Sequence, residues 1–164
     1  MSRKVALIDT GATEALGAAL AAALAGLQGP RVLALSGELG AGKTTLTRGL
    51  LRALGVKGTV RSPTYTLVES YELASWQVHH LDLYRLRDTG EAEGLGLRDL
   101  LSATALLVIE WPERDATLAA CTDLQVRLVY AGDARRAEIE ACSPAGREWL
   151  EALAALRPAV TFMS

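Results

Sequence analysis

Apolar and polar residues along this 164-residue chain form patterns that are typical of buried strands and amphipathic helices. Arg31 to Ser36 and Ala105 to Trp111 are short, mainly apolar runs bounded by proline or glycine, which predicts two buried strands. Between them, Lys43 to Leu54 places its leucines at helical spacing and is followed by Gly55, a common residue at helix ends. We expect the second strand to lie deep in a sheet, because strands buried on both faces read as continuous apolar runs.

Alternation of apolar and polar residues elsewhere predicts two antiparallel hairpins. Their turns are expected at Ala74-Ser75 and at Ala131 to Asp133. Three further elements are expected: an edge strand over Val5 to Ile8, an Ala-rich buried helix over Thr13 to Leu27 that Thr10 caps, and a C-terminal helix from Ser143-Pro144 to about Leu156. Together they predict an α/β fold in three layers with a mixed, partly antiparallel central sheet.

Composition and charge indicate a single-domain protein and argue against nucleic-acid-binding and membrane proteins. A chain in which 50% of residues are hydrophobic and 22% are charged is expected to form a single domain over residues 1–164. The net charge of -2 argues against direct binding of DNA or RNA through a broad basic surface, so partners would have to hold any RNA. The apolar run Ala15 to Leu27 is too short to span a membrane, and Cys121 and Cys142 form no disulfide or metal pattern. We therefore expect a cytoplasmic protein.

A glycine-rich segment joins the first predicted buried strand to its helix. GELGAGKT, Gly37 to Thr44, matches the phosphate-binding pattern G-x-x-x-x-G-K-[ST]. Glycines let backbone N–H groups surround phosphate oxygens, so we expect Lys43 to reach the terminal phosphates and the Thr44 hydroxyl to bind Mg²⁺. A glycine-rich turn that matches by coincidence is the alternative, and the flanking strand and helix disfavour it. The nucleotide contacts expected here are Gly37, Glu38, Leu39, Gly40, Ala41, Gly42, Lys43, Thr44 and Thr45.

Two carboxylates end strands where a phosphate site needs an acid. Glu110 ends the second apolar strand, and Asp82 ends a more polar one. One is expected to contact the metal's water shell and the other to orient the attacking water; Glu110 is the candidate for the metal, and the spacing leaves open which of the two activates the water. Thr64 occupies a stretch where many nucleotide hydrolases place a threonine that senses the terminal phosphate. His79 and His80 point to opposite faces of a strand, so structural or partner-facing roles are expected for them.

Five sequence blocks carry a resemblance that extends well beyond the phosphate loop. GELGAGKTTLTRG, SPTYTLVESY, HLDLYRL, GLGLRDLL and VIEWPER lie within Leu33 to Arg114. Their order and spacing resemble those of the bacterial TsaE (YjeE) family, the ATPase component of tRNA threonylcarbamoyladenosine synthesis. The resemblance implies a P-loop NTPase fold that binds and hydrolyses ATP with Mg²⁺. The chain has no asparagine, which excludes the guanine-reading motif N-K-x-D and also favours ATP.

The resemblance also implies partners and residue roles. TsaD and TsaB would transfer the threonylcarbamoyl group to the adenosine beside the anticodon, and this chain would meet tRNA only through them. The implied catalytic residues are Lys43, Thr64, Asp82 and Glu110, with Thr44 and Glu110 at the metal and Trp111 beside Glu110. Adenine and ribose contacts are implied near Thr10 and near Ala134-Arg135, where the family often has Gly-Arg and this chain departs from the pattern.

Two other functions fit a small chain with a phosphate loop. In a small-molecule P-loop kinase, Arg85 to Asp99 would form a lid whose arginines clamp the transferred phosphate. The sequence shows no acceptor pocket for such a kinase, and the same segment could instead be a docking surface that leads into a short helix near Leu97 to Leu101. In a nucleotide-gated interaction module, ATP would control partner binding with almost no hydrolysis. Phosphate transfer to a metabolite would identify the first, and ATP-dependent binding without turnover the second.

Overall fold

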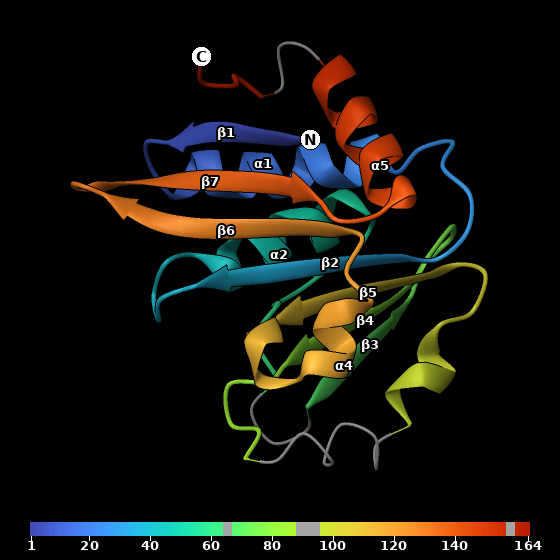
Figure 1. The fold of residues 1–164 in the computed structure, drawn as a ribbon. Helices are drawn as coiled ribbons and strands as arrows, with labels where there is room; N and C mark the ends of the chain where they lie inside the picture. Colours follow the sequence, from blue (N-terminus) through green and yellow to red (C-terminus); the bar gives the residue numbers. More distant parts are fainter. Residues whose placement is uncertain (64–66, 88–95, 157–159) are drawn as a thin grey trace.

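The computed structural model describes residues 1–63, 67–87, 96–156 and 160–164, and in this part of the chain it contains a seven-stranded mixed sheet (Figure 1). The strand order is β1-β7-β6-β2-β5-β4-β3. The strands are β1 (Ser2–Leu7), β2 (Arg31–Gly37), β3 (Val68–Glu72), β4 (Gln77–Asp82), β5 (Ala105–Glu110), β6 (Leu124–Ala131) and β7 (Ala134–Ala141). The helices are α1 (Thr10–Ala23), α2 (Lys43–Ala53), α4 (Ala116–Ala120) and α5 (Pro144–Ala155), with 3-10 turns η1 (Leu97–Leu100) and η2 (Pro112–Arg114).

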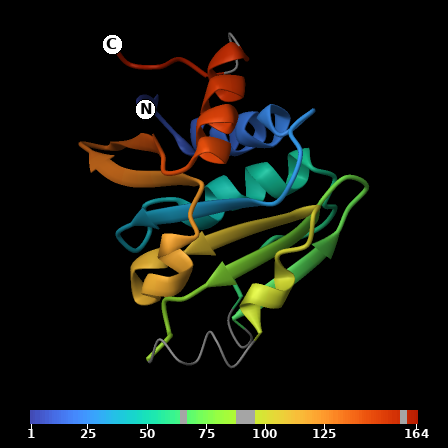
Figure 2. The ribbon, with the colours of Figure 1, turned by 45° about the vertical axis from the view of Figure 1, so that its right-hand side comes forward.

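Helices pack on both faces of the sheet, which confirms the predicted three-layer α/β architecture (Figures 1 and 2). Side chains of β2 alternate between two hydrophobic cores. Leu33 and Leu35 belong to the larger core, which the sheet shares with α1, α2 and α5. Val32 belongs to the smaller core, beside Leu118 of α4. All residues of β5 are buried, as its continuous apolar sequence predicts.

The sheet topology brings the predicted site residues to one edge. Strand β2 pairs in parallel with β5 and β6, and β4 pairs in parallel with β5, whereas the remaining pairs are antiparallel and include both predicted hairpins. Parallel strands end at the same edge of a sheet, where ligands of open α/β folds bind. Gly37, Asp82 and Glu110 therefore lie at a common edge, and Asp82 is the direct register partner of Glu110.

Helix α1 differs from its prediction at both ends. It covers Thr10–Ala23 rather than Thr13 to Leu27, and the predicted cap at Thr10 is wrong because Asp9 is the N-cap. The Asp9 carboxylate accepts the N–H of Ala12 at 2.7 Å, so the cap lies one residue earlier, and the helix starts three residues earlier, than predicted. The edge strand covers Ser2–Leu7, and α4 and η2 were not predicted. None of the helices in the described residues is long and apolar enough to cross a membrane.

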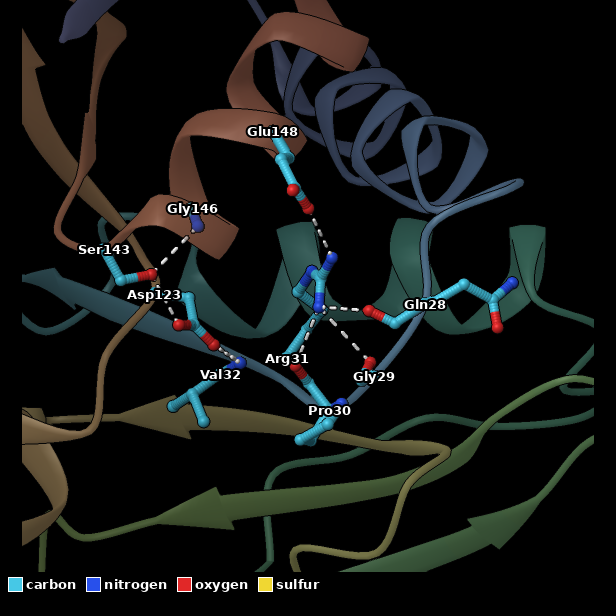
Figure 3. Close-up of polar contacts among 9 residues, drawn as sticks. All are labelled: Gln28, Gly29, Pro30, Arg31, Val32, Asp123, Ser143, Gly146 and Glu148. Atoms are coloured by element: carbon cyan, nitrogen blue, oxygen red, sulfur yellow. Dashed lines mark hydrogen bonds and ion pairs between the residues drawn. The ribbon is translucent and has the colours of Figure 1, made fainter.

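A network of polar contacts surrounds the start of β2, at the end of the sheet opposite the glycine-rich loop (Figure 3). Arg31, at the start of β2, is 3% exposed; its Nη1 donates to the backbone carbonyls of residues 28–30, and its Nη2 lies 3.1 Å from Glu148 of α5. Asp123 accepts a backbone N–H of β2 at 2.8 Å and the hydroxyl of Ser143 at 2.6 Å. Ser143 in turn caps α5. These contacts join β2, β6 and α5 at the end of the molecule that carries no predicted chemistry.

Helices α1 and α2 approach closely through two glycines, which leads to a stability prediction. A Cβ atom at Gly49 would lie 2.1 Å from the carbonyl oxygen of Glu14, and one at Gly17 would lie 2.1 Å from that of Leu46. Gly49→Ala is therefore expected to lower the free energy of unfolding by about 2–3 kcal/mol, because the helices must move apart. Urea denaturation measures this. Gly11→Ala, in the first turn of α1, is the control and should change stability by less than about 1 kcal/mol; equal losses would contradict the prediction.

Candidate functional site

The glycine-rich loop runs from the end of β2 to the start of α2. Gly40 has φ of 78° and Gly42 has φ of 110°, in the left-handed region that residues with side chains rarely adopt. Gly42 is the N-cap of α2, and its carbonyl accepts the N–H of Leu46 at 2.9 Å. Ala41 is buried, and its N–H donates to the carbonyl of Glu38 at 3.0 Å. The loop therefore curls around the first turn of α2, whose unpaired N–H groups and positive dipole end favour an anion.

Lys43 crosses the loop instead of extending into solvent. Its Nζ donates to the carbonyls of Gly37 at 2.6 Å and Glu38 at 2.9 Å, and lies 4.3 Å from the centre of the Trp111 ring. Burial lowers the pKa of Lys43, while the charge of Glu110 opposes the shift. An ammonium group has three N–H donors, so two hold the loop and the third can donate to another acceptor.

Glu110 is the centre of a buried polar cluster. The side chain is 2% exposed, and its Oε1 accepts the Thr44 hydroxyl at 3.3 Å. Its Oε2 accepts the Ser62 hydroxyl at 3.1 Å and lies 2.6 Å from Nε2 of His80, whose N–H donates to the carboxylate. The Ser62 and Thr44 hydroxyls also lie within hydrogen-bond distance of each other, and because each has a single proton, the one that donates to the other does so in place of its bond to Glu110. The structure brings the predicted residues Glu110 and Thr44 together and adds two residues that the predicted site did not include: Ser62, and His80, for which only a structural or partner-facing role was expected.

Asp82 lies beside this cluster at the end of β4. Its side chain is partly buried, and its Oδ1 accepts the backbone N–H of Tyr84 at 3.0 Å. Burial raises the pKa of Asp82, and the neighbouring charge of Glu110 adds to the shift. A cavity of about 320 Å³ opens in front of both carboxylates and is also lined by Lys43 and Trp111. The predicted lysine, hydroxyl and acids therefore share one cavity.

Trp111 is held over the ammonium group by an unusual backbone conformation. Its φ of 59° is the only positive value at a non-glycine position within the described residues. Its N–H donates to the carbonyl of Leu35 at 3.2 Å, and its ring lies 5.0 Å from that of Tyr84. Such strain persists where the surrounding structure enforces it, often at functional sites. Here it directs the indole to Lys43, which shields that side of the ammonium from water.

A second cavity, of about 180 Å³, lies on the other side of the loop. It is lined by the end of β1, the start of α1, the loop itself and the turn between β6 and β7. Thr10 and Arg135, the two predicted nucleoside contacts, both line it together with Gly40, Gly42 and Thr45. The structure thus brings these distant residues to one place, next to the phosphate loop. Thr64 lies outside the described residues, as does most of the predicted lid Arg85 to Asp99.

Comparison with known proteins identifies the family. The family model for threonylcarbamoyl adenosine biosynthesis protein TsaE matches residues 7–138, which is most of the chain. The chain belongs to the TsaE family. The phosphate loop, both strand-end carboxylates and Arg135 of this TsaE chain all lie within the matched residues.

Individual TsaE relatives and one solved structure agree with this assignment. The tRNA threonylcarbamoyladenosine biosynthesis protein TsaE of Haemophilus influenzae is 45% identical over 118 residues, which cover 72% of this chain and 75% of the relative. That of Aquifex aeolicus is 40% identical over 102 residues, covering 61% and 71%. The crystal structure of Bacillus subtilis YdiB matches with a TM-score of 0.77 and 26% identity over 94% of this chain and 95% of YdiB. This TsaE chain therefore has the P-loop NTPase fold that the sequence resemblance implied.

Proposed function

We propose that this TsaE family member binds Mg-ATP at residues 37–45 and hydrolyses it to support threonylcarbamoyl modification of tRNA. The observation that carries the proposal is the convergence of Lys43, Thr44 and Glu110 at the mouth of one cavity beside the loop. The transfer itself belongs to TsaD and TsaB, and the chain supplies the ATP-dependent step. The net charge of -2 supports this division, because partners rather than this chain would hold the tRNA.

The donor set next to the loop fits Mg²⁺. The Thr44 hydroxyl and the Glu110 carboxylate are 3.3 Å apart, and both present the hard oxygen ligands that this ion prefers. Thr44 would bind the ion directly, and Glu110 would hold it through the ion's bound water. When bound, Mg²⁺ neutralises charge that develops on the terminal phosphates. The pairing of Glu110 with buried His80 and Ser62 keeps the carboxylate aimed at Thr44.

Each remaining residue then has a task in hydrolysis. Lys43 donates its third N–H to the terminal phosphates, and the loop N–H groups surround them. Asp82, whose Oδ1 is held by the N–H of Tyr84, presents Oδ2 to the attacking water and accepts its proton. Trp111 limits water access to Lys43. Thr64 is assigned to sensing the terminal phosphate on the basis of the family resemblance alone.

The cavity beyond the loop is the proposed nucleoside site. Thr10 and Arg135 would contact the ribose and adenine there, and the triphosphate would extend from this cavity across the loop toward Asp82. The alanine at position 134 replaces the glycine that is frequent in the family and still leaves Arg135 on the cavity wall. ATP is expected over GTP, since the chain lacks the asparagine of the guanine-reading motif.

The proposal predicts that ATP hydrolysis limits repeated modification. Reconstitution with TsaD, TsaB and tRNA should give many turnovers with Mg-ATP and a single turnover when a non-hydrolysable analogue replaces it, because the assembly cannot be reset. Quench-flow measurement of modified tRNA tests this, with pull-downs of TsaD and TsaB in ATP, ADP and no nucleotide as a parallel measurement. Multiple turnovers with the analogue would contradict the proposal. Transfer of the terminal phosphate to a metabolite, faster than hydrolysis, would instead identify a kinase.

A further inference from the structure

The tip of the phosphate loop is held from outside by a tyrosine of β6. The hydroxyl of Tyr130 donates to the backbone carbonyl of Leu39 at 3.1 Å. A Cβ atom at Gly40 would lie 3.3 Å from the same hydroxyl, so the tyrosine packs directly against the loop backbone. The side chain of Leu39 is 69% exposed and provides no anchor of its own. The Leu39 side chain therefore does not hold the tip of the loop, and the Tyr130 hydroxyl holds it instead.

The ring of the same tyrosine contacts Arg135, the arginine that lines the proposed nucleoside cavity. Tyr130 and Arg135 are direct register partners on the antiparallel strands β6 and β7. The Arg135 guanidinium lies 4.0 Å from the centre of the Tyr130 ring, and its Nη1 donates to the carbonyl of Ala134 at 3.2 Å. A cation over an aromatic face is held by attraction to the ring quadrupole. One side chain thus contacts the phosphate loop with its hydroxyl and the nucleoside-side arginine with its ring.

The contacts that Lys43 makes with the loop differ from that of Tyr130, because Lys43 is also proposed to contact the ligand. The carbonyls of Gly37 and Glu38 are held by Lys43, which must also serve the phosphates. Tyr130 comes from a separate hairpin, so its bond to Leu39 is available whether or not a ligand is present. A loop that is ordered before binding loses less conformational entropy when the ligand arrives. The geometry therefore favours a role in pre-ordering the loop.

We infer that Tyr130 is a positioning residue for the phosphate loop: its hydroxyl holds the tip in the conformation that receives a polyphosphate, and its ring orients Arg135 toward the nucleoside. This inference rests on the proposed binding of Mg-ATP. It implies that the hydroxyl acts on the phosphate end of the ligand and Arg135 on the nucleoside end. Inorganic tripolyphosphate, which has no nucleoside, separates the two effects.

The test compares Mg-ATP with Mg-tripolyphosphate by titration calorimetry. Tyr130→Phe removes the hydroxyl and keeps the ring under Arg135, so it is expected to raise the Kd of both ligands by the same factor, about threefold. Arg135→Ala is expected to raise the Kd of Mg-ATP more than that of tripolyphosphate. In the ligand-free protein, Tyr130→Phe should also accelerate hydrogen exchange of the amides in residues 38–41. Tyr71→Phe on β3, far from the loop, is the matched control and should change none of these values.

Each outcome decides the inference. A loss confined to Mg-ATP would overturn it, because Tyr130 would then contact the nucleoside rather than position the loop. Unchanged affinities and exchange rates would overturn it as well, as would a fall in thermal stability without a change in Kd. If the unaltered protein bound neither ligand, the proposed nucleotide site itself would fail, and this is visible before any variant is compared.

Discussion

Lys43→Ala is expected to weaken Mg-ATP binding by about 100-fold and to abolish repeated turnover. The substitution removes the charge-assisted contact to the phosphates and the Nζ bonds to the carbonyls of Gly37 and Glu38, although the Glu38 carbonyl still accepts the N–H of Ala41. The loop would then lose both its ligand contact and the bridge that holds its first residues together. Titration calorimetry measures the affinity, and the reconstituted modification reaction measures turnover.

Two further lysine variants sharpen this experiment. Lys43→Arg keeps the positive charge, yet its planar fork cannot replace a compact ammonium between two carbonyls and beneath the Trp111 ring, so a large loss is expected again. Lys57→Ala, at an exposed position after α2, is the control and should bind Mg-ATP normally. Thermal melting establishes that each variant is folded. Multiple turnovers by a folded Lys43→Ala variant would show that the loop does not serve ATP hydrolysis.

Much of the fold is predictable because its signals are local. The spacing of Gly37, Gly42 and Lys43 encodes the loop within eight residues, and a continuous apolar run identifies β5 as a central strand. The hairpin turns are likewise marked by short runs of turn residues. Element boundaries depend on competition between neighbouring groups and are less predictable. At the start of α1, both Asp9 and Thr10 can cap a helix, and only the structure shows that Asp9 does so.

The polar cluster around Glu110 is less accessible to sequence reasoning. His80 and Asp82 alternate with Leu81 along β4, so a strand with a period of two places both side chains on one face. This signal could have indicated that His80 belongs with the strand-end acids. The parallel register that sets Asp82 opposite Glu110 is a tertiary property and has no local signal. Ser62 lies in an irregular stretch, and nothing in its sequence context indicates a bond to Glu110.

Substitutions of the two carboxylates are expected to change different kinetic quantities. Asp82→Asn should lower the single-turnover hydrolysis rate by about 100-fold while leaving the Kd of Mg-ATP nearly unchanged, because it removes a proton acceptor and no contact to the loop. Glu110→Gln should instead raise the Mg²⁺ concentration that binding and hydrolysis require, because this carboxylate faces the Thr44 hydroxyl. Rapid-quench hydrolysis assays over a range of Mg²⁺ concentrations, with TsaD and TsaB present, distinguish the two patterns.

The expected separation follows from how each acid is held. Glu110 is 2% exposed, and both of its oxygens accept hydrogen bonds, so it has little freedom to follow a reacting water molecule. Asp82 faces the cavity with a pKa that burial raises, which suits proton uptake better than permanent charge near a metal. Glu69→Gln, at an exposed position on β3, controls for loss of a negative charge and should behave as the unaltered protein. If Asp82→Asn responded to Mg²⁺ and Glu110→Gln did not, the two roles would be reversed.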